Sequence, residues 1–418
     1  MAMDRTEITI DAGRLEQELL ALAKIGQHGE TGVWRTAYSP EWLDAQNHIL
    51  AWCQEAGFEA RMDAAGNVWG TLAGTEPGKS FVSGSHIDSQ KPGGRYDGTL
   101  GVLAALSAVR ALARQFGRPR RTLEIVSLAE EESSRFPGSN FLGSRAILGK
   151  LSPQDAEELV GYEGETLAEA MRQAGLDPLQ LPTAARDDIA DFIELHIEQG
   201  PILEQAGVPV GIVTAINGIR HYVVELTGRS DHAGARPMDT RLDPMAGAAE
   251  IALGVIDTAL RMGRPAVTTI GRMLVEPNGP AIVPEKVSFT IDARHSDPAA
   301  RAQLYQRHEE WMRAVAARRG LGLNYRVSND VAPLVIDPAI VALLEESARA
   351  QQVAYLAMPS GAVHDTQNMA AIARVGMIFV QSKGGRSHTP AEHTTLEDAV
   401  AGVKVLAGAL HRRVCANS

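Results

Sequence analysis

The sequence of 418 residues has almost no cysteine, because only Cys53 and Cys415 occur and they lie far apart. A disulfide framework and a cysteine-based zinc site are therefore excluded. The sequence also lacks any run of about 18 apolar residues, the length that a membrane-spanning helix needs. Its first residues, Met1 to Arg5, contain no apolar segment of the kind found in signal peptides, so we expect a cytoplasmic enzyme with no membrane partner.

An excess of basic residues is missing as well. There are 40 lysines and arginines against 51 aspartates and glutamates, which gives a formal net charge of −11. This balance opposes binding to nucleic acid or to an anionic membrane surface. With 44% hydrophobic and 22% charged residues, the composition is that of a globular protein, and its length predicts two domains.

A Gly- and Ser-rich stretch over residues 84–98 holds the first group of polar side chains. The apolar run that ends at Val82 predicts a buried strand, and we expect the stretch to be a loop at its C-terminal end, where open α/β sheets carry their sites. His86 and Asp97 are residue types that bind divalent metals, and Asp88 is placed to orient His86. Taken alone, the stretch is either a metal site or a polar surface loop.

Two further polar groups follow predicted strands. Glu130 to Glu132 end a strand predicted over residues 121–129, and they are either a solvated charge run or part of a site at the same sheet edge. His196 lies near the end of a strand predicted over residues 191–200, and it is either a structural histidine or a ligand. The polar residues expected at the shared edge favour metal chemistry for both.

The last part of the chain adds polar segments at residues 360–365 and 382–393. The second segment follows a strand predicted to end at Val380, and its glycines allow the backbone to approach a ligand closely. His388 is a candidate ligand, whereas we expect His393 at a helix start or on the surface.

The predicted elements divide the chain into two domains. Residues 213–328 read as strand, helix, strand, strand, helix and strand, which is the order of the ferredoxin-like fold. Residues 1–212 and 329–418 form a discontinuous α/β domain that this segment interrupts, and the joints are natural hinges. The predicted helices are 12–24, 41–56, one from residue 99, 244–261, 298–319, 341–349, 363–373 and 396–410, with two short helical segments between residues 130 and 190.

Seven ordered segments resemble the M20 peptidase-like superfamily, in its hydantoinase/carbamoylase branch of linear ureide amidohydrolases. The branch includes N-carbamoyl-L-amino-acid hydrolases, allantoate amidohydrolases and β-ureidopropionases. The resemblance covers nearly the whole chain. The segments are GSHIDSQKPGGRYDGTLG, EEESSRFPGSNFLGSRA, ELHIEQGPILE, GRSDHAGARPMDTRLDP, FTIDARH, SGAVHD and GGRSHTPAEHT.

The resemblance implies a mixed-sheet α/β metallohydrolase domain with two divalent ions, zinc or manganese, with cobalt or nickel as further candidates. One ion would be bound by two histidines, the other by a glutamate and a histidine, and an aspartate would bridge them. The implied ligands are His86 and His196 for the first ion, Glu132 and His388 for the second, and Asp97 for the bridge.

The resemblance also implies that Glu131 is the general base, which takes a proton from water and passes it to the leaving nitrogen. Neighbouring side chains of an extended segment point in opposite directions, so a bend is needed to present both Glu131 and Glu132. Glu130 has no such counterpart and is expected to be structural.

The inserted domain is implied to serve as a lid and as the interface of a homodimer. His232 matches the histidine that polarises the scissile carbonyl, and Arg294 matches the guanidinium that binds the substrate carboxylate. Gln199 and His364 match further substrate contacts.

Three positions depart from the family pattern. Ala281 stands where an asparagine is common, and Asn278 is the nearby candidate to replace it. Val363 replaces the usual glycine before His364, and Arg236 stands where threonine is frequent. The implied ligand set shows no departure, so the departures concern which ureide is bound.

The leading hypothesis is a metal-dependent amidohydrolase that cleaves the carbamoyl C–N bond of a linear, carboxylate-bearing ureide, such as an N-carbamoyl-L-amino acid or allantoate. The alternative within the superfamily is an aminoacylase or exopeptidase that acts on N-acyl or peptidyl amides. A non-catalytic scaffold would be expected to lack a ligand or the base, and neither is missing here.

Overall fold

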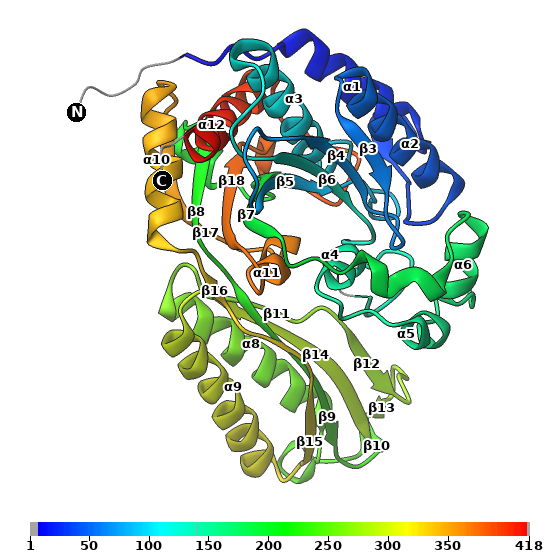
Figure 1. Ribbon diagram of the computed structural model, residues 1–418. Coiled ribbons are helices and arrows are strands. Elements are labelled where there is room, and N and C mark those ends of the chain that lie inside the picture. The colour runs from blue at the N-terminus through cyan, green and yellow to red at the C-terminus, as the bar shows by residue number, and fades with distance from the viewer. Residues whose placement is uncertain (1–6, 140, 416–418) are drawn as a thin grey trace. The chain divides into compact units, whose positions relative to one another are not determined.

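The computed structural model describes residues 7–139 and 141–415, and the chain divides into two compact units (Figure 1). Unit 1 comprises Met1–Thr214, Ile336–Met358 and His364–Ser418, and unit 2 comprises Ala215–Val335 and Pro359–Val363, each taken over its described residues. Within the described ranges, no helix is long and apolar enough to cross a membrane.

Unit 1 is organised on a mixed sheet in the order β8-β18-β7-β5-β6-β4-β3. The strands β18, β7, β5 and β6 run parallel, while β8, β4 and β3 pair antiparallel with their neighbours. This confirms the predicted mixed α/β fold. The strands are β3 (Glu59–Met62), β4 (Val68–Leu72), β5 (Ser80–His86), β6 (Leu123–Leu128), β7 (Ile189–Ile197), β8 (Val210–Ile216) and β18 (Arg374–Val380).

The parallel strands are buried along nearly their whole length, and β18 is a continuous apolar run after Arg374, whereas β5, β6 and β7 also carry buried polar residues. Helix α3 (Thr99–Phe116) is buried from Thr99 to Leu112 and packs on β5, β6 and β7, in keeping with the mostly apolar sequence of this part. It also contacts α12 (Leu396–Cys415). The other long helices of unit 1 are α1 (Ala12–Lys24), α2 (Pro40–Glu55) and α10 (Pro338–Ala350).

Short elements complete unit 1. They are β1 (Gln27–His28), β2 (Gly32–Val33), α4 (Leu142–Ile147), α5 (Pro153–Glu158), α6 (Leu167–Gln173), a 3-10 helix at Pro178–Ala184, α7 (Ile202–Ala206), α11 (Asp365–Met369) and a 3-10 helix at Lys383–Gly385. Strand β17 (Tyr355–Ser360) begins in unit 1, ends in unit 2 and pairs with β8.

The sequence prediction was wrong at several boundaries. Gly84 to His86 were expected in a loop, but they continue β5, because β6 supplies a ladder partner for each of them. The helix predicted over residues 363–373 is only Asp365–Met369, because His364 is extended at its start. Four short helices, not two, lie among the described residues between 130 and 190.

Unit 2 is a five-stranded antiparallel sheet with two helices against it. The sheet order is β11-β14-β9-β15, with β12 also pairing with β14, and the core lies between this sheet and helices α8 and α9. Along the chain the main elements are β9 (Gly218–Thr227), α8 (Pro244–Met262), β11 (Val267–Thr269), β12 (Met273–Glu276), β14 (Lys286–His295), α9 (Pro298–Arg319) and β15 (Gly322–Val331). The short elements are β10 (Asp231–His232), a 3-10 helix at Met238–Thr240, β13 (Ile282–Val283) and β16 (Leu334–Val335).

The strand predicted directly after the first helix of residues 213–328 is split into β11 and β12. Thr269 pairs with Asp292 and Met273 pairs with Phe289, so β11–β12 has one residue more than the facing part of β14. An extra residue in one strand of an antiparallel pair interrupts the ladder, which is why one predicted strand becomes two short ones.

Candidate functional site

The polar side chains of unit 1 gather at the C-terminal ends of the parallel strands. His86 is the last residue of β5 and His196 is the penultimate residue of β7, while Glu132 follows β6 and His388 follows β18. Because β18, β7, β5 and β6 are neighbours and parallel, these four ends meet at one sheet edge. Asp97 joins them from the loop that precedes α3.

Asp97 stands between two groups of donor atoms. Its Oδ1 lies 3.2 Å from Nε2 of His196 and 3.5 Å from Nε2 of His86. Its Oδ2 lies 3.6 Å from Nε2 of His388, which lies 3.3 Å from Oε2 of Glu132. Within each group the donor atoms all lie within 4.8 Å of one another. One carboxylate is thus shared by two compact sets of imidazole and carboxylate donors.

A third set of residues close enough to hold an ion consists of Glu194, His196 and His364. Both oxygens of Glu194 already accept hydroxyl hydrogen bonds, from Ser85 at 2.7 Å and from Thr366 at 2.6 Å. These contacts satisfy the Glu194 carboxylate without an ion, so the two sets that share Asp97 are the better candidates.

The two buried histidines are oriented by backbone carbonyls. Nδ1 of His86 lies 3.1 Å from the carbonyl of Asp88, and Nδ1 of His196 lies 3.0 Å from that of Ile197. Each carbonyl accepts a hydrogen bond from Nδ1–H, which leaves a lone pair on Nε2. In His196 this Nε2 accepts the backbone N–H of Gly98 at 3.1 Å. Nε2 of His86 is buried without a hydrogen-bond partner among the described residues, as expected of a ligand atom.

The Asp88 side chain does something other than orient His86. Its two oxygens accept the backbone N–H groups of Glu131 at 3.2 Å and of Glu132 at 3.1 Å, whereas its Oδ1 is 3.6 Å from His86. The Asp88 carboxylate therefore holds the two glutamates in place, and the Asp88 backbone holds the imidazole.

The bend required to present two adjacent glutamates is present. Glu130 and Ser133, on either side of the pair, both have left-handed φ values of 50°. The Glu130 carboxylate is buried and accepts the backbone N–H groups of Phe136 at 3.0 Å and Arg135 at 3.3 Å. These bonds keep the chain turned, and Oε2 of Glu131 comes to 3.7 Å from Nε2 of His86.

The site concentrates buried negative charge. Burial raises the pKa of Glu131 well above its usual value, with Glu132 adding to the effect and His86 opposing it. Burial likewise raises the pKa of Glu132, and Asp97 adds to that effect. Burial also opposes ionisation of Asp97, but His196 and His86 outweigh it and hold its pKa well below the usual value. Divalent cations would offset this cost of burying carboxylates.

The other predicted residues of unit 1 lie beside this centre. Nε2 of Gln199 donates to Oδ2 of Asp97 at 2.8 Å, and the His364 ring centroid is 4.8 Å from that of His196. Sequence reasoning missed two further contacts. The Ser387 hydroxyl is 2.5 Å from Oδ2 of Asp97, and Nε2 of Gln90 donates to Oε2 of Glu132 at 2.9 Å.

The remaining predicted residues belong to unit 2. Nδ1 of His232 accepts the backbone N–H groups of Gly234 and Ala235, both at 3.1 Å. An imidazole whose Nδ1 accepts two hydrogen bonds carries its proton on Nε2. His232 thus offers an N–H donor at its outer end.

Arg294 is anchored by Asp292, two residues before it on β14. Nε and Nη2 of Arg294 donate to the two oxygens of Asp292, each at 2.9 Å, and Nη1 donates to the carbonyl of Gly361 at 3.2 Å. Burial raises the pKa of Asp292, but His221 and Arg294 outweigh burial and lower it to about 2. Two N–H groups, one on each terminal nitrogen of Arg294, remain for another acceptor.

Asn278 and Ala281 lie in the turn between β12 and β13. Asn278 is exposed and has a φ of 59°. The carbonyl of Ala281 accepts the backbone N–H of Ala233 at 3.0 Å, which places Ala281 next to the strand of His232. The Arg236 side chain donates to the carbonyl of Thr240.

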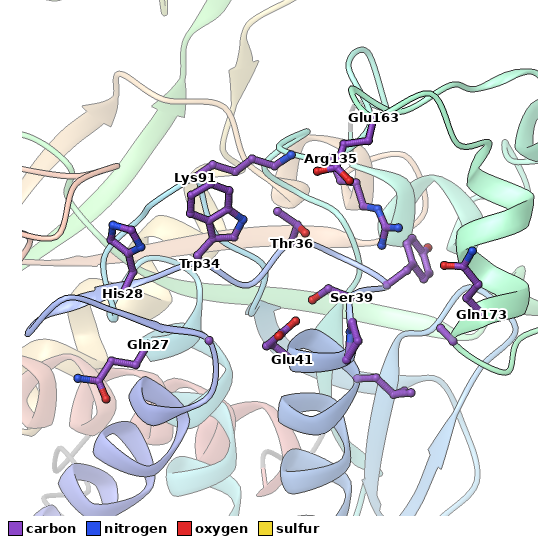
Figure 2. Close-up of a pocket in the computed structure, with 15 residues that line it drawn as sticks. Gln27, His28, Trp34, Thr36, Ser39, Glu41, Lys91, Arg135, Glu163 and Gln173 are labelled. Atoms are coloured by element: carbon purple, nitrogen blue, oxygen red, sulfur yellow. The ribbon is translucent and has the colours of Figure 1, made fainter.

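A separate cavity of about 650 Å³ opens in unit 1 (Figure 2). Figure 2 shows Trp34, Lys91 and Arg135 on its wall, and none of its 15 lining residues is a predicted site residue. Lys91 follows Gln90, which contacts Glu132. The cavity therefore borders the segments that support Glu132 without including a ligand.

Comparisons with known proteins identify the family of this chain. The family model described as peptidase family M20/M25/M40 matches residues 82–412. The allantoate amidohydrolase of Escherichia coli (strain K12) is 40% identical over 399 residues, 95% of this chain and 97% of that protein. The N-carbamoyl-L-amino acid amidohydrolase of Geobacillus stearothermophilus is 39% identical over 400 residues, 95% of this chain and 97% of that protein. The crystal structure of a hydantoinase/carbamoylase family amidase from Burkholderia multivorans has a TM-score of 0.91 at 33% identity, covering 98% of this chain and 100% of that one.

Proposed function

Because this chain belongs to peptidase family M20/M25/M40, in its hydantoinase/carbamoylase branch, we propose that it is a metal-dependent amidohydrolase that cleaves the carbamoyl C–N bond of a linear, carboxylate-bearing ureide. An N-carbamoyl-L-amino acid or allantoate is the substrate we propose. The observation that carries the proposal is Asp97, which is shared by two sets of metal donors beside a largely buried glutamate, Glu131.

We propose that residues 1–212 and 329–418 hold two divalent ions, of zinc or manganese, with cobalt and nickel as further candidates. The mixed imidazole and carboxylate donors suit these metals, and the unpartnered Nε2 of His86 fits a ligand role. Two such ions, when bound, would lower the pKa of a bound water and polarise a carbonyl oxygen. The proposed ligands are His86, Asp97, Glu132, His196 and His388.

Glu131 is the proposed general base. It removes a proton from the attacking water and delivers it to the leaving nitrogen of R–NH–CO–NH₂. The C–N bond to the carbamoyl group then breaks, and the carbamate decomposes to carbon dioxide and ammonia while the free amine departs. The hydrogen bonds from the backbone N–H groups of Glu131 and Glu132 to the Asp88 carboxylate support this role, since they fix the backbone from which both glutamate side chains extend.

His232 is proposed to donate its Nε2 proton to the carbonyl oxygen as negative charge develops there. Its support is the pair of backbone N–H groups at Nδ1, which set the tautomer that donates.

We expect His232→Ala to lower kcat by about 10²–10³-fold, with a smaller effect on KM, because the bond strengthens only as the oxyanion forms. Steady-state kinetics on the preferred ureide measure this. His232→Asn keeps a side-chain N–H donor and should recover part of kcat. A His232→Ala enzyme with wild-type kcat would refute the role.

Arg294 is proposed to bind the substrate carboxylate with the two N–H groups that its contacts with Asp292 and Gly361 leave over. The ion pair with Asp292 holds the guanidinium in one orientation, which reduces the entropy lost when the carboxylate binds. Gln199, His364 and Asn278 are proposed as further substrate contacts.

Arg294→Ala should raise KM by about 30-fold or more, because truncating one partner of a hydrogen-bonded charge pair costs about 2 kcal/mol or more. The measurement is KM for a carboxylate-bearing ureide. Arg326→Ala, which removes an exposed arginine of β15, is the control and should leave KM unchanged. An unchanged KM in Arg294→Ala would show that Arg294 does not bind the substrate carboxylate.

Residues 213–328 are proposed to form a ferredoxin-like lid that also joins two chains in a homodimer. Helix α8 supports the dimer, because Met245, Leu253, Ile256 and Leu260 lie on one face of it and are exposed, Leu253 by 72% and Leu260 by 74%. Sedimentation equilibrium tests this, and a monomer at micromolar concentration would contradict it. The cytoplasmic location stays a prediction.

The substrate class is tested by an ammonia-release screen over allantoate, ureidoglycolate, N-carbamoyl-β-alanine and N-carbamoyl-L-amino acids, with added manganese, zinc or cobalt. N-acyl amino acids and dipeptides are assayed in parallel for the aminoacylase or exopeptidase alternative. Ammonia release from a ureide without cleavage of the amides supports the proposal. Cleavage of the amides alone would favour the alternative, and turnover of neither class would favour a non-catalytic scaffold.

A further inference from the structure

One buried carboxylate outside the proposed ligand set joins two loops that are far apart in the sequence. Glu392 is 3% exposed, and its Oε1 accepts the backbone N–H groups of Tyr96 at 2.8 Å and Asp97 at 2.9 Å. Its Oε2 lies 3.2 Å from the hydroxyl of Ser387. Glu392 therefore connects the loop of Asp97 to the segment that carries His388.

Gly94 provides the space for this contact. A Cβ added to Gly94 would lie 2.2 Å from Oε1 of Glu392 and 2.5 Å from its Cβ, distances that side chains do not tolerate. Gly94 does not have a left-handed φ, so the close approach of Glu392, and not backbone strain, is what disfavours a side chain here.

The ligands differ in how much support they receive from secondary structure. His86 and His196 lie on β5 and β7, in the interior of the sheet, where hydrogen bonds to neighbouring strands fix the backbone. Asp97 and His388 lie in loops. Loop residues lose more conformational freedom when they bind an ion, unless other contacts hold them beforehand.

We propose that Glu392 is a positioning residue that fixes the backbone of Asp97 and the segment of His388, and thereby sets the affinity of the ion held by Asp97, Glu132 and His388. This rests on the two-ion centre of the proposed function. Glu392 acts through hydrogen bonds to backbone groups, so a neutral acceptor of the same shape should replace it.

The test is calorimetric titration of the chelator-stripped full chain with Mn²⁺. Glu392→Ala should weaken the second ion by about 10- to 100-fold, the usual effect of removing a group that supports a ligand. Glu392→Gln should bind both ions with an affinity near that of wild type, because its amide oxygen still accepts from Tyr96 and Asp97.

Gly94→Ala tests the same contact from the other side, since its methyl group displaces the Glu392 side chain. It should weaken the binding of the second ion as Glu392→Ala does. If Glu392→Ala does not fold, Gly94→Ala provides the test in its place. The control is Asp63→Ala, which removes another buried carboxylate that accepts two backbone N–H groups, from Ala65 and Asn67. It should leave both Mn²⁺ affinities unchanged.

The outcomes separate this inference from the function on which it rests. A wild-type chain that binds fewer than two Mn²⁺ ions overturns the two-ion centre. A wild-type chain that binds two ions, with Glu392→Ala and Gly94→Ala binding equally well, overturns the positioning role alone. Equal weakening by Glu392→Gln and Glu392→Ala would also overturn it, because charge and not position would then matter.

Discussion

Glu131→Gln is expected to lower kcat by about 10²–10⁴-fold, the range that a positioned general base contributes. The substitution preserves the size of the side chain and removes only its capacity to take a proton from water and return it to the leaving nitrogen. The metal ligands are untouched, so the variant should retain the metal content of wild type. Steady-state kinetics on the preferred ureide and elemental analysis of the same sample measure the two quantities.

A neighbouring residue provides the control for this change. Glu130→Gln is the same substitution one position earlier, and its amide oxygen still accepts the backbone N–H groups of Phe136 and Arg135. We expect it to keep a kcat near that of wild type. The assignment of the base fails if Glu131→Gln remains nearly as active as wild type, or if Glu130→Gln loses as much activity.

The position of the site could be predicted from the sequence because it depends on one simple feature of the fold. Strands β5, β6, β7 and β18 could each be expected from the sequence, and polar residues end these strands or follow them. Parallel strands place those residues at one edge, so separate motifs could be expected to converge before any contact was known. The family resemblance then assigned a role to each residue that the spacing alone left open.

The supporting contacts could not be predicted in the same way. Glu392 lies 295 residues from Asp97, and the Asp88 carboxylate is 43 and 44 residues from the two backbone groups it accepts. Nothing in local periodicity links such positions, because the contacts form only when loops from different strands meet. Within residues 382–393, Glu392 is one of several polar residues, and nothing in the local sequence sets it apart.

Strand β8 was not predicted, and His86 was not expected in a strand. Strand β8 is a short apolar run without alternation, and such a run is typical of a buried strand or of a helix segment alike. His86 was assigned to a loop because Gly84 and Ser85 precede it, although both are held in β5 by pairing with β6. Tertiary pairing overrode the local preference of glycine and serine.

The second large effect is expected from Asp97→Ala, which should weaken the binding of both ions by more than about 100-fold, beyond the range for merely supporting groups. The two oxygens of Asp97 face different donor sets, with Oδ1 3.2 Å from His196 and Oδ2 3.6 Å from His388. No other predicted ligand belongs to both sets. Turnover should fall below detection, since the proposed activation of the water depends on both ions.

His388→Ala provides the comparison, because His388 belongs only to the set with Glu132. This variant should weaken the binding of one ion and leave the binding of the other unchanged. His393→Ala, a surface histidine five residues later, should affect neither. Mn²⁺ calorimetry on the three chelator-stripped variants distinguishes two losses, one loss and none. If Asp97→Ala removed only one ion, the two donor sets would not be joined by a shared carboxylate, and the dinuclear centre would have to be replaced by two independent sites.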